Sequence, residues 1–168
     1  MRKLAEVFLL AENRLLREAL SRLLSKKSEI RVVGANSYSI AVQQEIVAAR
    51  PNIILFDSSG LASRIGALLT TLRAAIRNVR IIMVDMDEDE GIFLGAIRSG
   101  VVGYVLKEAS AAEVADTICA VAAGRAVCPP SLCMTLFRSI AKQMPALSKT
   151  FWVADFGLSH RISRSRIC

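Results

Sequence analysis

Short runs of apolar residues alternate along the chain with longer segments in which apolar residues recur every three or four positions. The short runs fall at residues 6–10, 30–33, 51–57, 80–84 and 101–106. The longer segments fall between and after them, at residues 14–24, 39–50, 63–76, 87–99 and 110–123. Strands that alternate with amphipathic helices form βαβ units, so the pattern predicts an α/β domain with a five-stranded parallel sheet.

Residues with strong capping preferences mark the ends of the predicted helices. Asn13 is a candidate N-cap of the first helix, and Gly100 and Gly124 stand where the fourth and fifth helices end. The acidic run at residues 87–90 suits the start of the fourth helix, because the helix dipole favours negative charge there. Right-handed crossovers then predict a doubly wound, flavodoxin-like sheet of strand order 2-1-3-4-5.

The run at residues 51–57 is apolar through its last four positions before it ends in Asp57. Such a run is typical of a strand buried on both faces of a parallel sheet. Open α/β sheets bind ligands at the carboxyl ends of their strands, near the switch point, here between the first and third strands. Glu12 and Asp57 follow these two strands, and Asp85 and Lys107 follow the fourth and fifth. Three acids and one lysine are therefore expected at one edge of the sheet.

The composition is that of an aliphatic globular protein. The 168 residues are 53% apolar and 5% aromatic, which suits one domain with an appendage. No apolar run is long enough to span a membrane, and no secretory signal pattern follows Met1, so we expect a cytoplasmic protein with no membrane partner. The cysteines lack the spacing of a zinc site or a disulfide framework, and we expect buried or incidental thiols at Cys119, Cys128, Cys133 and Cys168.

The formal net charge of +7 is concentrated in the last quarter of the chain. Residues 125–168 carry seven Lys and Arg against one acid, whereas residues 1–124 carry 15 against 14. A basic appendage of this size often contacts nucleic-acid phosphates. A solvated, partly disordered tail has the same composition, and the sequence leaves both interpretations open.

Three segments carry a resemblance to a known family. Residues 51–57 (PNIILFD) end in an aspartate, residues 97–109 (IRSGVVGYVLKEA) are close to the pattern A/G-x-G-Y-x-L-K-D-A, and residues 124–132 (GRAVCPPSL) are similar to the start of a linker. With these residues the chain resembles a response-regulator receiver domain (CheY-like), most of all those of NarL/FixJ (LuxR-type) transcription regulators. The resemblance implies a two-component system, in which a sensor histidine kinase phosphorylates the receiver in a phosphorelay.

The resemblance also implies roles for individual residues. Asp57 matches the phosphoacceptor, Lys107 matches the lysine that balances charge on the transferring group, and Tyr104 matches the switch aromatic. In the family a Mg²⁺ ion, which prefers oxygen ligands, binds at the acidic pocket. Its ligands here would be Glu12, Asp57 and the backbone carbonyl of Ser59.

Two positions depart from the family pattern. Ala11 replaces one of two acids before the first helix, which weakens the Mg²⁺ site. Asp85 replaces the Ser or Thr that binds the phosphoryl group, and an ionised carboxylate donates no hydrogen bond. Two unit charges about 4 Å apart repel by roughly 4 kcal/mol at an effective dielectric of about 20. Asp85 either supplies the lost metal ligand or pairs with Lys107, and weak or absent phosphorylation of Asp57 is the resulting hypothesis.

Other functions stay open at this point. A phosphorylation-independent pseudo-receiver would act as a dimerisation or protein-interaction module, and either kind of receiver is expected to form a homodimer through its fourth-helix/fifth-strand/fifth-helix face. A flavodoxin-like or phosphatase-like enzyme is the alternative from another class. Residues 11–14 (AENR) lack the glycines and hydroxyls of a phosphate-binding loop, and Ser59 stands where a DxD phosphatase has its second aspartate. We therefore expect no enzyme activity on a metabolite.

The domain organisation follows from the same resemblance. Residues 1–124 are the predicted receiver domain, residues 125–145 a linker helix, and residues 146–168 a basic tail that is a remnant or truncated start of a helix-turn-helix domain. The tail lacks a recognition helix that would enter a major groove, so we expect no specific DNA binding. Candidate contacts to phosphates, which give non-specific binding only, are Arg161, Arg164 and Arg166.

Overall fold

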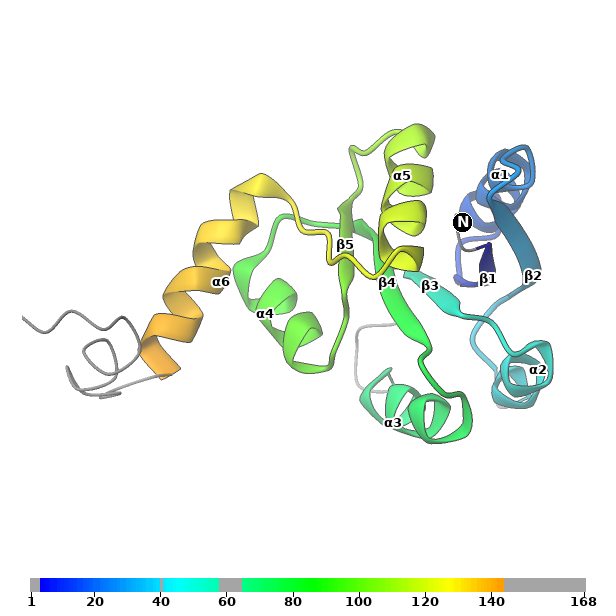
Figure 1. The fold of residues 1–168 in the computed structure, drawn as a ribbon, viewed down its shortest axis with the longest axis horizontal. Coiled ribbons are helices and arrows are strands. Elements are labelled where there is room, and N and C mark those ends of the chain that lie inside the picture. The colour runs from blue at the N-terminus through cyan, green and yellow to red at the C-terminus, as the bar shows by residue number, and fades with distance from the viewer. Residues whose placement is uncertain (1–3, 40, 58–64, 144–168) are drawn as a thin grey trace, which may run out of the picture.

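The predicted sheet is confirmed in a computed structural model, which describes residues 4–39, 41–57 and 65–143. Its five strands are parallel and run in the order β2-β1-β3-β4-β5 (Figure 1). The strands are β1 (Ala5–Leu10), β2 (Ile30–Asn36), β3 (Ile53–Asp57), β4 (Arg80–Met86) and β5 (Gly103–Leu106). The switch point between β1 and β3 is therefore where the sequence predicts it.

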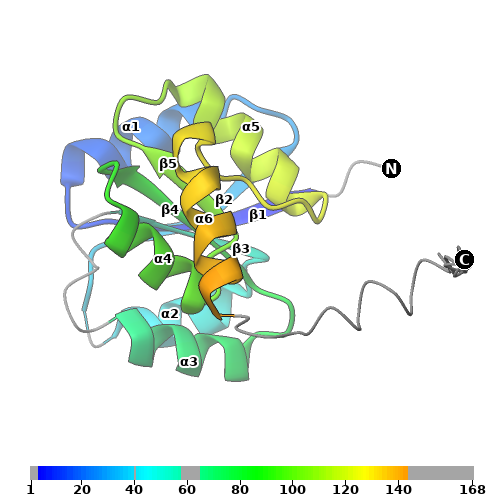
Figure 2. The same cartoon turned by 90° about the vertical axis from the view of Figure 1, so that its left-hand side faces the viewer.

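Helices cover both faces of the sheet. They are α1 (Arg14–Leu24), α2 (Val42–Ala49), α3 (Ile65–Ala75), α4 (Glu90–Arg98), α5 (Ala111–Ala122) and α6 (Pro130–Gln143). The apolar residues of α1 and α5 pack on one face of the sheet, and those of α2, α3 and α4 pack on the other (Figure 2). No helix in the described part of the chain is long and apolar enough to cross a membrane.

The central strand β3 is buried from end to end, as its uninterrupted apolar sequence predicts. Ile54 and Phe56 belong to the core beneath α2, α3 and α4, and Ile53 and Leu55 belong to the core beneath α1 and α5. Successive side chains of a strand point to opposite faces, so β3 needs apolar residues at every position. The apolar run ends at Asp57, which is the last residue of the strand.

The ends of the helices confirm the predicted caps. The Asn13 side chain accepts a hydrogen bond from the Leu16 amide at 3.1 Å, which satisfies a free N–H in the first turn of α1. Gly100 has φ +81°, a left-handed conformation that ends α4 at little cost for glycine. The second helix begins later than predicted, at Val42, and the Ser39 hydroxyl just before it accepts a hydrogen bond from the Val42 amide at 3.2 Å.

The end of β4 differs from the prediction. The strand does not end at Asp85 but continues to Met86, and its pairing with β5 shifts between Met83 and Met86. Two residues of β4 lie opposite one of β5, which makes a β-bulge, and Asp85 in the bulge has φ +58°. Aspartate tolerates this left-handed conformation better than most residues. The bulge sets the direction of the side chains at this corner of the candidate site.

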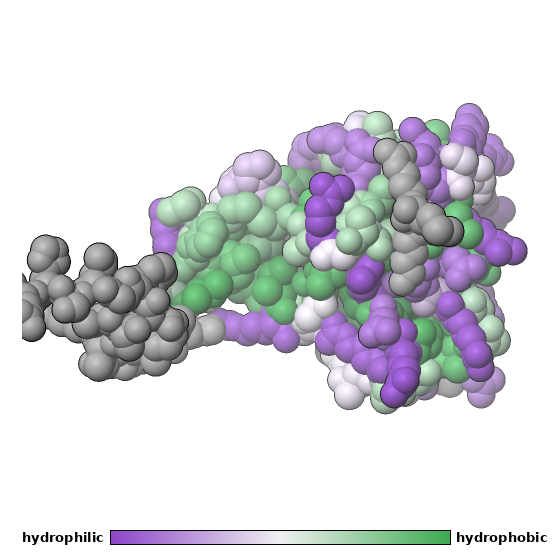
Figure 3. All heavy atoms as spheres, in the orientation of Figure 1, coloured by the Kyte–Doolittle hydropathy of each residue, from purple (hydrophilic) through white to green (hydrophobic). Residues whose placement is uncertain are grey.

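The segment predicted as a linker helix forms α6, which packs along α4 (Figure 2). Leu132 is 2% exposed and joins the core beneath α4, and the Thr135 hydroxyl donates to Glu90 at 2.7 Å. The outer side of the helix is apolar as well (Figure 3), with Met134, Phe137 and Ile140 exposed. One side of the helix therefore packs against the core beneath α4, and the opposite side is apolar and exposed.

Candidate functional site

The carboxylate of Asp57 lies at the carboxyl end of β3 and is only 1% exposed. Its Oδ2 accepts hydrogen bonds from the backbone amides of Glu12 at 2.8 Å and Asn13 at 3.4 Å. Both amides belong to the loop just before α1, where the helix dipole also favours an anion. The β1–α1 loop thus closes over Asp57 through its backbone.

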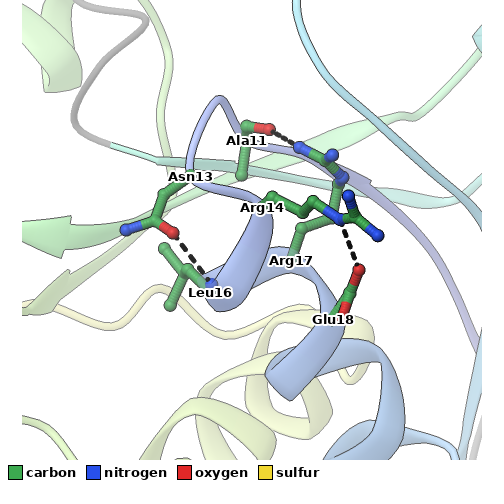
Figure 4. Close-up of polar contacts among 6 residues, drawn as sticks. All are labelled: Ala11, Asn13, Arg14, Leu16, Arg17 and Glu18. Carbon is green, nitrogen blue, oxygen red and sulfur yellow. Dashed lines mark hydrogen bonds and ion pairs between the residues drawn. The ribbon is translucent and has the colours of Figure 1, made fainter.

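Ala11 holds this loop in place from the strand side. Its side chain is buried, its amide donates to the Asn36 carbonyl at 3.1 Å, and its carbonyl accepts from the Arg17 guanidinium (Figure 4). The family pattern has an acid here, whereas this chain has a methyl group. A carboxylate is absent from this position, and the loop carries the backbone contacts to Asp57 instead.

Glu12, the remaining acid of the predicted metal site, is directed elsewhere. Its Oε1 accepts a hydrogen bond from the backbone amide of Tyr38 at 2.9 Å. The contact joins the β1–α1 loop to the β2–α2 loop at the same edge of the sheet. The amide of Glu12 therefore contacts Asp57, while its carboxylate holds the neighbouring loop.

Tyr38 is a residue of the site that the sequence reasoning missed. Its ring stacks on Phe56, with centroids 6.2 Å apart and planes at 28°. Burial raises the pKa of the Tyr38 phenol, and the negative charge of Asp57, a hydrogen-bonding interaction with it, and the charge of Glu12 raise that pKa further. The contact with Asp57 is looser than a regular hydrogen bond, since the buried hydroxyl has no partner of regular geometry in the part of the chain described. The available signal was an aromatic residue between the second predicted strand and the second predicted helix, at the edge that carries Asp57.

Lys107 does not form the ion pair with Asp85 that the sequence left open. Its ammonium group binds the Asp87 carboxylate instead. The hydrogen bond to Asp87 is the main cause that raises the pKa of Lys107, followed by the charge of Asp87 and smaller effects of Glu108 and Asp85. Asp87 was predicted only as part of an acidic helix start, and it precedes the N-cap Asp89 of α4.

Asp85 stands one residue beyond Val84, which is the register partner of Asp57 in the neighbouring strand. Asp85 and Lys107 are among the residues that line a pocket of about 190 Å³ between α1, β4, β5 and α5. The predicted juxtaposition of acids at one sheet edge is thus present in the backbone. The ion pair of Lys107 differs from the one considered in the sequence analysis, since it forms with Asp87 and not with Asp85.

Tyr104, which the sequence matched to the switch aromatic, is buried and only 1% exposed. Its ring meets Phe93 edge-on, with centroids 5.1 Å apart and planes at 84°. Its hydroxyl donates to the Asp87 carbonyl at 3.1 Å, and burial, then the charges of Asp89 and Asp87, raise its pKa to about 12. Asp87 therefore contacts both Tyr104 and Lys107. Its backbone carbonyl accepts from the Tyr104 hydroxyl, and its carboxylate binds the Lys107 ammonium group.

The described residues do not fit a Mg²⁺ ion in this arrangement. The ion needs several convergent oxygen ligands. Oδ2 of Asp57 is bonded to two amides, the Glu12 carboxylate is bonded to Tyr38, and no group of three or more His, Cys, Asp or Glu side chains converges in the described part of the chain. The predicted ligand Ser59 and the candidate phosphate contacts Arg161, Arg164 and Arg166 lie outside the described residues.

A parallel 2-1-3-4-5 sheet with a buried aspartate ending β3 and a lysine after β5 has the architecture of a response-regulator receiver domain. No family model matches the chain. The probable transcriptional regulatory protein NarL of Mycobacterium tuberculosis is 26% identical over 118 residues, which are 70% of this chain and 55% of that protein. The transcriptional regulatory protein LnrK of Bacillus subtilis is 27% identical over 123 residues, which cover 70% of this chain and 54% of LnrK.

The solved structures agree with these relatives. The signal receiver domain of the putative response regulator NarL from Mycobacterium tuberculosis matches with a TM-score of 0.63 and 25% identity, covering 73% of this chain and 99% of that one. The homologues of this chain are two-component response regulators of the NarL/LuxR family, and its described part is a receiver domain by fold. The chain spans about half the length of the curated relatives it matches.

Proposed function

We propose that this chain acts as the receiver module of a two-component response regulator and accepts a phosphoryl group on Asp57 from a sensor histidine kinase. The observation that carries the proposal is the buried carboxylate of Asp57 at the carboxyl edge of β3, in a chain whose homologues are response regulators. Burial at the end of a rigid central strand fixes the direction of the carboxylate. Such fixed positioning is what phosphoryl transfer asks of a protein.

The chemistry follows from the groups around the carboxylate. An oxygen of Asp57 attacks the phosphorus atom of the donor, the bond to the donor's leaving group breaks, and an acyl phosphate remains on the protein. The amides of Glu12 and Asn13 lie beside Oδ2 and favour negative charge there. Lys107 stands at the same edge, and it must exchange Asp87 for the phosphoryl group to balance the new charge.

The partners proposed for the module follow from its faces. A homodimer through α4, β5 and α5 would meet α6 at the α4 side, so the exposed apolar residues of α6 would take part in it. We keep the division into a receiver domain at residues 1–124, a linker helix at 125–145 and a basic tail at 146–168, and we place the protein in the cytoplasm. Control of transcription would need a DNA-binding part, and for the basic tail we propose non-specific contacts to phosphates.

A second candidate function is the phosphorylation-independent pseudo-receiver. Three contacts favour it: Tyr38 beside Asp57, Glu12 on Tyr38, and Lys107 on Asp87. Together they hold the residues of the site in one arrangement without a phosphoryl group. In this candidate function the folded surface binds partners constitutively.

The test is the intact mass of the full chain after incubation with a small-molecule phosphodonor, with and without Mg²⁺. A receiver gains the mass of one phosphoryl group, and the gain disappears under alkaline hydroxylamine, which cleaves acyl phosphates. No gain with the small donor, nor with a panel of sensor kinases, would overturn the proposal and leave the pseudo-receiver. The Mg²⁺ arms report whether the weakened acidic pocket still uses the ion.

Replacing Tyr38 by phenylalanine is expected to speed phosphoryl uptake about two- to tenfold, the equivalent of one hydrogen-bonding interaction with the carboxylate. The substitution removes the interaction between the Tyr38 hydroxyl and Asp57, whereas the phenyl ring keeps the stacking on Phe56. The initial rate of mass gain measures the effect. Tyr104→Phe serves as the matched control, because its hydroxyl contacts Asp87 rather than Asp57. A slower Tyr38→Phe chain would mean that the hydroxyl assists the transfer.

A further inference from the structure

Two cysteines meet at the joint between the receiver and α6. Cys128 follows Val127, whose backbone is hydrogen-bonded to β5 and to the residue before it. The Tyr104 amide donates to the Val127 carbonyl at 3.0 Å, and the Val127 amide donates to the Val102 carbonyl at 2.9 Å. Cys133 lies in the first turn of α6. Their sulfur atoms are 2.7 Å apart, although the sequence alone suggested incidental thiols.

The backbone between the two thiols is restricted before any bond forms. Pro129 and Pro130 fix two successive φ angles, and the Leu132 amide donates to the Pro129 carbonyl at 3.0 Å. Leu132 is buried in the core beneath α4, which holds the first turn of α6 in place. A disulfide needs its sulfur atoms about 2.0 Å apart, and the two sulfur atoms of this pair, at 2.7 Å, are already close to that distance.

The pair is accessible to a small oxidant. Both thiols are partly exposed, and Cys128 lines a pocket of about 570 Å³ together with Arg125, Pro129 and Pro130. Burial, then the hydrogen bond to Cys133, raises the pKa of the Cys128 thiol to about 11. Since the thiolate is the nucleophile, Cys128 reacts slowly at neutral pH, unlike the thiol of a peroxide-reducing enzyme.

We propose that Cys128 and Cys133 are a redox-active dithiol that a small disulfide such as glutathione disulfide converts to an intramolecular disulfide. One thiolate attacks a sulfur of glutathione disulfide, whose S–S bond breaks and releases one glutathione thiolate. The second cysteine attacks the protein sulfur of this mixed disulfide and releases the second glutathione. Two electrons and two protons thus pass from the protein to one glutathione disulfide.

The bond would fasten the first turn of α6 to the segment that pairs with β5. The position of α6, and with it the direction in which the chain continues after residue 143, would then be fixed covalently rather than by the seat of Leu132 and Thr135 alone. The inference does not depend on phosphorylation of Asp57. It assigns a modification site to a part of the chain that the proposed function leaves without chemistry.

The experiment equilibrates the full chain with defined ratios of glutathione disulfide to glutathione, stops the exchange with acid, then alkylates the free thiols in denaturant near neutral pH, and measures intact mass and cross-linked peptides. The expected product has lost two hydrogen atoms and carries a Cys128–Cys133 cross-link. The Cys133→Ser variant is expected to stop at a mixed disulfide with one glutathione attached to Cys128, because the resolving thiol is missing. A variant with Cys119→Ser and Cys168→Ser is the matched control and is expected to form the cross-link as the parent does.

A second arm of the experiment tests whether the folded structure, and not only the short sequence separation, brings the two thiols together. In urea the fraction oxidised at a given glutathione ratio is expected to fall several-fold, because the prolines and the seat of Leu132 no longer hold the thiols together. An equal fraction in urea and in buffer would overturn the inference. So would a cross-link that joins other cysteines, or thiols that stay free at every glutathione ratio.

Discussion

The Asp57→Asn chain is expected to show no phosphoryl uptake, whatever the donor. An amide does not attack phosphorus as a carboxylate does, so the covalent step has no nucleophile. The asparagine oxygen still accepts from the amides of Glu12 and Asn13, which keeps the β1–α1 loop closed. The fold is therefore expected to survive, and the loss is one of chemistry. Intact mass after donor treatment measures it, with circular dichroism and thermal unfolding as checks on the fold.

Asp87→Asn is the matched control for this substitution. Asp87 is an exposed acid of the same edge that contacts Lys107 and lies outside β3. Its amide variant removes the same charge and is expected to retain uptake, since it also frees Lys107 for the transferred group. An Asp57→Asn chain that still gained a phosphoryl mass would show that another residue is the acceptor, and the assignment of Asp57 would then be wrong.

Removal of the charge at Asp85 is expected to raise the equilibrium extent of phosphorylation by up to about three decades. The basis is the repulsion of roughly 4 kcal/mol between two unit charges about 4 Å apart at an effective dielectric of about 20. The backbone places Asp85 one residue beyond the register partner of Asp57, at the end where the phosphoryl group would stand. The ratio of phosphorylated to free chain at a fixed donor concentration measures the change.

The β-bulge decides which substitution tests this charge best. Asp85 has φ +58°, which asparagine adopts readily and β-branched threonine does not. Asp85→Asn therefore removes the charge without backbone strain. Asp85→Thr restores the hydroxyl of the family pattern but is expected to lower the free energy of unfolding by about 1–3 kcal/mol through that strain. If Asp85→Asn takes up no more phosphate than the parent, the carboxylate of Asp85 does not face the phosphoryl group.

The sequence by itself determined the fold and the position of Asp57 in the sheet. Strand and helix periods, the Asn13 cap and the terminal Gly100 are local features, and they predicted the element order and the 2-1-3-4-5 sheet. Asp57 at the end of a fully apolar run had one possible place in such a sheet. Backbone topology follows from hydrophobic pattern because burial is decided residue by residue along the chain.

Only the tertiary structure decided which side chains meet. The pairing of Lys107 with Asp87 rather than Asp85 depends on a β-bulge between β4 and β5. The sequence around Asp85 contains no local pattern that predicts such a bulge. The approach of Tyr38 to Asp57 depends on how two loops from different strands fold over one edge. These contacts join residues far apart in sequence, and side-chain direction and strand register, which decide them, are set by packing of the whole domain.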